Sequence, residues 1–209
     1  STSDPLNPYG ALLHATVLNS RTVDFEDRID EEELALACKK VEYLADNYFA
    51  DKDSSVAYRF YHGSVEMYRM LLQVKRGSYL KAFNGIRRAA KYFEEAVEMD
   101  STFWDAYYGV GIYTYYRSSR AGLLRKLHLI ADKRELGINY IQIAADRGTI
   151  TSLASHNTMG WIAIEQEEYE QSLTISSRLN DQYPNSRAFL WCMGNALKEL
   201  GRWHEVISV

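Results

Sequence analysis

Apolar residues recur every three or four positions along most of this chain, the spacing that places side chains on one face of an α-helix. In residues 31–49 this face is formed by Leu34, Ala37, Cys38, Val41, Leu44 and Ala45. The same spacing predicts helices over residues 9–19, 31–49, 56–75, 79–99, 103–117, 133–147, 152–166, 168–182 and 187–200, with another beginning near Arg202. No segment alternates apolar and polar residues convincingly. The pattern therefore predicts an all-α chain of antiparallel helices joined by short loops.

Glycines recur at equivalent positions of several predicted helices. Gly160 and Gly194 each follow a methionine and are 34 residues apart. Earlier in the chain the interval is longer, with 48 residues from Gly63 to Gly111 and 49 from Gly111 to Gly160. A fixed interval of this size is typical of helical-repeat proteins, in which each unit is one helix hairpin. We expect the glycines to let the first helix of each hairpin approach its neighbour closely.

A second pair of positions gives the same long interval, because 48 residues separate Ala89 from Gly137. The early units are therefore enlarged by 14 residues (48 − 34), which fall at about 70–83 and 118–131. Shared between two helices, these residues lengthen each helix by roughly 10 Å. The helices on either side of residues 70–83 should then exceed the usual length of about 13 residues.

The unit that contains Gly160 also carries Tyr169 at the start of its second helix and Pro184 at its end. With the period of 34 residues, these residues resemble the tetratricopeptide repeat. The resemblance implies a right-handed superhelical solenoid of antiparallel helix hairpins, all-α, with residues 1–209 as one domain. Its units would cover about 9–50, 56–101, 103–149, 153–186 and 187–209, the last incomplete.

The stretch from Gly111 to Tyr116 is similar to one in a group of bacterial tetratricopeptide proteins with enlarged units. Many of that group look exported, so the resemblance implies an exported or periplasmic protein, with the cytoplasm as the alternative. The last hairpin stops early at Val209, so we expect the natural protein to continue. Apolar surface there should be exposed or covered by a second copy of the chain, through Leu190, Leu197, Trp203 and Val206.

Composition fits a folded protein, with 46% hydrophobic and 25% charged residues among 209. The net charge of −4 argues against nucleic acid as the partner. The two cysteines, Cys38 and Cys192, are too few for a disulfide framework and are expected to be buried apolar residues. No apolar run approaches the roughly 20 residues of a membrane-spanning helix.

No catalytic constellation stands out from the sequence. Phosphate-binding loops, HExxH and GxSxG motifs and metal-ligand spacings of His and Cys are absent. His62 and Glu66 lie four residues apart on one helix face, which could be half a metal site but is more often a structural pair. We therefore expect no catalytic residue, no metal and no cofactor, and a binding scaffold rather than an enzyme.

The segment 117–134 is basic and amphipathic. It carries six lysines or arginines and one acidic residue, Asp132, interleaved with leucines. Such a segment could face a lipid surface, which would make the chain a membrane-associated assembly factor. The simpler interpretation is that the leucines pack on the neighbouring insert and that the charges face water.

The strongest functional pattern is a stripe of aromatic and amide side chains. In the tetratricopeptide pattern the first helix of each unit lines a concave groove, and its groove positions here hold Phe60, Tyr68, Tyr108, Ile112, Tyr115, Tyr116, Asn157, Trp161, Trp191 and Asn195. An aromatic groove with a few amides suits a protein or peptide partner. Two alternatives stay open: a strongly curved stack would bury part of this stripe, and a Tyr-lined pocket could hold a substrate or cofactor.

Overall fold

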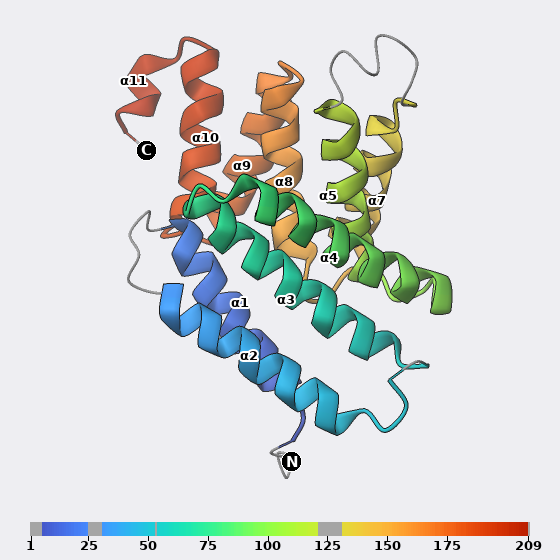
Figure 1. Cartoon of the computed structure of the whole chain (residues 1–209). Helices are drawn as coiled ribbons and strands as arrows, with labels where there is room; N and C mark the ends of the chain where they lie inside the picture. The colour runs from blue at the N-terminus through green and yellow to red at the C-terminus, as the bar shows by residue number, and fades with distance from the viewer. Residues whose placement is uncertain (1–5, 25–30, 53, 121–130, 209) are drawn as a thin grey trace.

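The structure is a computed structural model that describes residues 6–24, 31–52, 54–120 and 131–208. In these ranges the chain forms ten helices and no strand (Figure 1). The helices are α1 (Tyr9–Asp24), α2 (Glu31–Tyr48), α3 (Val56–Lys75), α4 (Tyr79–Met99), α5 (Ala106–Ser119), α7 (Arg134–Arg147), α8 (Ser152–Glu165), α9 (Tyr169–Gln182), α10 (Arg187–Glu199) and α11 (Trp203–Val206). The all-α prediction is confirmed for the described residues.

The helices α3 and α4 begin and end at the predicted residues. Ser55 caps the start of α3, because its side-chain oxygen accepts a hydrogen bond from the backbone N–H of Tyr58 (3.1 Å). Gly77 then reverses the chain with φ of +69°, a conformation that favours glycine. The two helices have 20 and 21 residues, against 13 or 14 for α5 and α7 to α10. Their predicted extension is confirmed.

Two predicted boundaries were wrong by three residues or more. Helix α1 continues five residues beyond the predicted end at Asn19, to Asp24. Helix α5 begins at Ala106 rather than at residue 103, because tight turns occupy the preceding residues. In these turns the N–H of Phe103 donates to the carbonyl of Asp100 (3.1 Å). Most of the second insert lies in residues 121–130, outside the described residues.

Consecutive helices pack against one another along the chain, as α1/α2, α3/α4, α5/α7, α8/α9 and α9/α10. In Figure 1 the long helices α3 and α4 run obliquely to the upright pairs α5/α7 and α8/α9. Contacts also join helices that are distant in sequence, because α3 touches α5 and α1 touches α10. The arrangement is that of an all-α helical repeat whose first helix reaches one of its last.

Glycines bring neighbouring helices close at two crossings. A Cβ atom on Gly137 of α7 would lie 2.6 Å from the backbone nitrogen of Tyr115 in α5, and one on Gly160 would lie 2.9 Å from the sulfur of Cys192. At Gly194, by contrast, a Cβ atom would meet nothing within 4 Å. A Cβ atom added to Gly111 would lie 2.8 Å from the carbonyl oxygen of Gly137. The expected role in close helix packing therefore holds for Gly111 and Gly160 but not for Gly194.

Two apolar clusters form the core. The larger joins α1 to α5 and includes Phe60, whose ring contacts those of Phe93 (5.9 Å between centroids) and Phe103 (5.2 Å). The smaller is formed by Tyr115, Ile141 and Ile162 from α5, α7 and α8. Both cysteines are buried and unpaired, as predicted.

Candidate functional site

A cavity of ≈ 300 Å³ lies between α1, α3, α5 and α8. It gathers four of the residues that the sequence predicts for a binding stripe: Phe60, Tyr68, Tyr108 and Ile112. Helix α1 supplies further wall residues that the sequence pattern did not indicate, namely Thr16, Asn19, Ser20 and Val23. The predicted groove positions of α3 and α5 thus converge on one enclosed space, which we call the concave cavity.

The hydroxyl groups of the two cavity tyrosines are hydrogen-bonded within the chain. The hydroxyl of Tyr68 pairs with the side-chain oxygen of Thr16 in α1 (2.7 Å), and that of Tyr108 pairs with Thr158 in α8 (3.2 Å). Burial raises the pKa of Tyr68 to about 12 and also raises the pKa of Tyr108. Both rings therefore stay neutral at physiological pH and present largely apolar faces to the cavity.

One polar atom of the cavity residues has no partner in the described part of the chain. The side-chain oxygen of Asn19 is buried there and accepts no hydrogen bond. A buried acceptor left unpaired costs about 1–3 kcal/mol. A bound group with an N–H or O–H donor would recover that cost, so the cavity combines apolar walls with one hydrogen-bond acceptor.

Asp105, just before α5, holds the loop that closes the cavity on the α8 side. One of its carboxylate oxygens accepts from the backbone N–H groups of Ile150 and Thr151 and from the Thr151 hydroxyl, each at 2.8 Å. The other accepts from the N–H of Thr149 at 3.2 Å. Ile150 and Thr151 line the cavity, so Asp105 positions its wall. No local motif could have indicated this role, because the partners lie 44 to 46 residues away.

Three of the predicted stripe residues lie in the core. Phe60 and Tyr115 are each 2% exposed, and Tyr116 packs beside the smaller apolar cluster. The Tyr115 hydroxyl donates to the carboxylate of Glu165 (3.2 Å). Burial and the nearby Glu165 charge raise the pKa of Tyr115 to about 12. These rings therefore contribute to packing, as the alternative of a curved stack predicted, although Phe60 also forms the cavity floor.

The remaining stripe residues lie on α8 and α10 and do not line the concave cavity. Asn157 and Trp161 are half-buried, and the side-chain oxygen of Asn157 is buried without a partner among the described residues. Trp191 and Asn195 line a separate hollow of ≈ 640 Å³ together with Trp203. The predicted continuous stripe is therefore divided into a cavity, a packed middle section and an outer hollow.

The apolar residues near residue 209 are exposed only in part. Trp203 is 59% exposed and lines the hollow with Leu190 and Val206, whereas Leu197 is buried. Association between copies through this surface stays a prediction.

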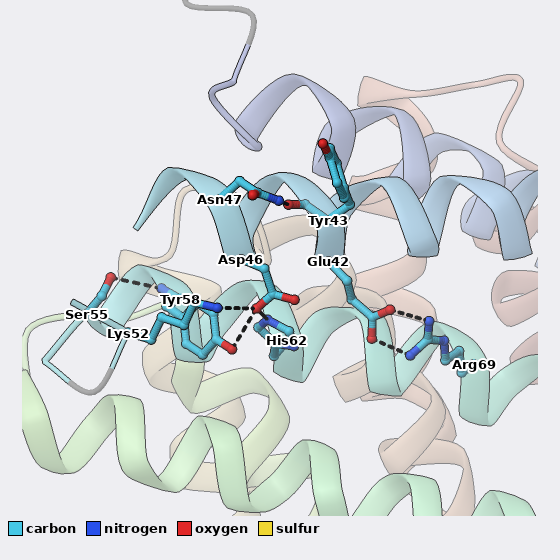
Figure 2. Close-up of polar contacts among 9 residues, drawn as sticks. All are labelled: Glu42, Tyr43, Asp46, Asn47, Lys52, Ser55, Tyr58, His62 and Arg69. Atoms are coloured by element: carbon cyan, nitrogen blue, oxygen red, sulfur yellow. Dashed lines mark hydrogen bonds and ion pairs between the residues drawn. The ribbon is translucent and has the colours of Figure 1, made fainter. Parts of the chain in front are cut away.

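His62 and Glu66 contact different partners. Figure 2 shows His62 facing Asp46 of α2, with the ring nitrogen 3.6 Å from a carboxylate oxygen. Glu66 pairs with Arg88 of α4 (2.7 Å). The ring of His62 also lies 4.3 Å from that of Tyr58, measured between centroids. No group of three or more metal-ligating side chains occurs among the described residues.

Burial and the nearby Asp46 charge have opposite effects on the pKa of His62. Burial lowers its pKa, and the Asp46 carboxylate counteracts part of that effect. Burial alone would raise the pKa of Asp46, but hydrogen bonds from Tyr58 and Lys52 and the nearby His62 lower it (Figure 2). The cluster joins α2 to α3.

Much of the basic stretch lies in residues 121–130, outside the described residues, so the proposed lipid-facing leucines cannot be placed. Its described ends interact within the chain: Arg117 stacks on Tyr113 (5.9 Å), and Arg134 pairs with Asp132 (2.8 Å). Within the described ranges, no helix has the length and apolar character needed to cross a membrane.

The described part of the chain is thus all-α, with helices packed in pairs and a cavity between α1, α3, α5 and α8. No family model, curated protein or solved structure matches the sequence or the structure.

Proposed function

We propose that this chain is a non-catalytic scaffold of tetratricopeptide type, a right-handed stack of helix hairpins that binds a protein or peptide partner. The partner inserts an apolar side chain into the concave cavity. One observation carries the proposal: predicted groove residues from two different units, Tyr68 of α3 and Tyr108 of α5, line the same cavity. That both tyrosines line one cavity supports the proposal that the repeat pattern of the sequence creates the binding site.

The size and chemistry of the cavity suit an anchor residue. At ≈ 300 Å³ it lies at the lower limit of the volumes typical of ligand pockets. Complete burial of a Leu, Met or Phe side chain contributes about 1.5–3 kcal/mol, which is the scale of a binding hot spot. A backbone N–H of the partner would donate to the unpaired Asn19 oxygen. Because α1 closes one side, the partner presents a single anchor rather than lying along an open groove.

A blocking variant tests this proposal without emptying the core. Ser20 of α1 and Ala154 of α8 line the cavity but belong to the exposed class, so the double variant S20F/A154F fills the opening while leaving buried residues in place. Val17 and Leu153 lie on the same two helices outside the cavity lining and are 57% and 40% exposed. V17F/L153F is therefore a matched control.

Peptides selected from a random 12-residue library on the wild-type chain provide the binding assay. We expect the blocking variant to weaken the selected peptides about tenfold or more, equivalent to 1.4 kcal/mol, at an unchanged melting temperature. The control should bind as the wild type does. Equal binding by the blocked variant and the wild type would refute the cavity as the site.

A further inference from the structure

A second pocket lies on the part of the fold created by the lengthened helices. It has a volume of ≈ 380 Å³ and is formed where the last turns of α3 and the first turns of α4 pass the N-terminal half of α2. Its lining shares only Met70 with that of the concave cavity. The pocket is thus a separate feature, and nothing about it depends on the proposed partner site.

The lining of this pocket is strongly cationic. Five of the eleven lining residues carry a positive charge and none carries a negative one, although the whole chain has a net charge of −4. The cationic residues come from all three helices: Lys39, Arg69, Arg76, Lys81 and Arg88. Carboxylates pair with the three arginines, whereas the two lysines have no such partner among the described residues. The site therefore keeps a net positive charge, which attracts anions and raises their local concentration.

Carboxylates that are not among the lining residues pair with the three arginines. Arg69 forms a two-pronged pair with Glu42, which Figure 2 shows between α2 and α3. Arg76 pairs with Glu31 (2.9 Å) and Arg88 with Glu66 (2.7 Å). The side chains of Glu31 and Glu66 are only 6% and 13% exposed. Each guanidinium has five N–H donors, so the groups that face the pocket keep donors for a ligand.

The other lining residues complete the site. Within the described residues, Lys39 and Lys81 form no ion pair or hydrogen bond, so their charges are not neutralised by the chain. The amides of Gln73 and Asn84 add neutral donors and acceptors. Leu72 and Met70 provide an apolar wall beside these groups.

We propose that this pocket binds a small molecule with two neighbouring oxyanion groups, the chemistry shared by diphosphates and compact polycarboxylates. Arginine forks match the geometry of phosphate and carboxylate oxygens, and the two unpaired lysines act as additional point charges. The volume exceeds what a single inorganic anion fills and lies within the range of small-molecule sites. The lengthening of α3 and α4 therefore serves a ligand site in addition to packing.

Titration calorimetry in phosphate-free buffer tests the proposal, with inorganic pyrophosphate and citrate as probes and a glutamate-rich peptide as comparison. The pocket variant is K39Q/K81Q, which removes two charges that form no ion pair. The control K40Q/K91Q makes the same change on the same two helices, at exposed positions outside the lining. Side-chain amide resonances of Gln73 and Asn84 report the location of binding.

We expect at least one small probe to bind with a Kd of about 1 mM or tighter, and added salt to weaken it. The pocket variant should lose tenfold or more, the control should stay within twofold, and the Gln73 and Asn84 resonances should shift. Preference for pyrophosphate would indicate a phosphate ligand, and preference for citrate a carboxylate. The proposal is overturned if neither small probe binds, if only the peptide binds, if both double variants lose affinity equally, or if the two amides do not respond.

Discussion

Replacing Asp105 by alanine should destabilise the chain strongly, because one carboxylate joins the start of α5 to the residues just before α8. The substitution removes three hydrogen bonds of 2.8 Å, to the N–H groups of Ile150 and Thr151 and to the Thr151 hydroxyl. Hydrogen bonds to a charged group contribute about 1.5–3 kcal/mol each. Even the lower value gives a loss of about 4.5 kcal/mol, a large part of the 5–15 kcal/mol typical of a folded domain.

Asp105→Asn should cost less, about 1–2 kcal/mol, because the amide oxygen can keep the three short contacts. The change removes the charge and the weaker acceptor for the N–H of Thr149 (3.2 Å). The loss in Asp105→Asn therefore measures the contribution of the charge to stability, and the additional loss in Asp105→Ala measures that of the hydrogen bonds. A helix N-terminus also favours a nearby negative charge, which the amide lacks.

Urea unfolding followed by circular dichroism measures both losses. We expect the midpoint of Asp105→Ala to fall by more than about 1 M, since the free energy of unfolding changes by about 1–3 kcal/mol per molar urea. Asp146→Ala is the control, because this exposed carboxylate of α7 accepts one hydrogen bond, from Gln142 (2.8 Å). It should change stability by no more than about 0.5 kcal/mol. A midpoint for Asp105→Ala equal to that of the control would refute the reasoning.

Two further predictions concern helix packing and pH. Gly137→Ala should lower the free energy of unfolding, measured with urea, by about 1–3 kcal/mol, because the new Cβ would lie 2.6 Å from the backbone nitrogen of Tyr115. Gly194→Ala should be neutral or stabilising, since its Cβ would meet nothing within 4 Å. Equal effects of the two substitutions would contradict the packing argument. The folded-state pKa of His62 lies below its usual 6.5, so as the pH falls below about 6.5 the unfolded chain takes up a proton first and stability is lost. His62→Gln should abolish the part of the stability loss between pH 7.5 and 5.5 that comes from His62, which is at most about 1.4 kcal/mol per pH unit. If the variant and the wild type lose stability equally over this range, the role of His62 is refuted.

Local sequence signals predicted the long helices well. The apolar spacing alone indicated the ends of α3 and α4. In the structure Ser55 and Gly77 fix the ends of α3 through a cap and a turn that involve only neighbouring residues. The start of α5 was missed because the turns near Asp100 and Phe103 contain apolar residues that continue the helical spacing. Periodicity alone does not distinguish such turns from a further helical turn.

The candidate site could be predicted only in part. The 48-residue repeat interval placed Phe60 and Tyr108 at equivalent positions, and both line the concave cavity. It could not indicate which members of the stripe would be covered, because coverage depends on how strongly the stack curves. Tyr115 is buried by Ile141 and Ile162 from two later helices. Ser20 and Val23 enter the cavity wall because α1 continues beyond its predicted end at Asn19.

The contact between α1 and α10 affects how the ends of this chain should unfold locally. In an open repeat array each unit holds only its neighbours, so the ends fray first and independently. Here fraying at one end breaks a contact with the other, which links the two ends in one cooperative unit. Amide protons of α1 should therefore exchange with solvent at a rate close to those of α10, and loss of one helix should accelerate exchange in the other.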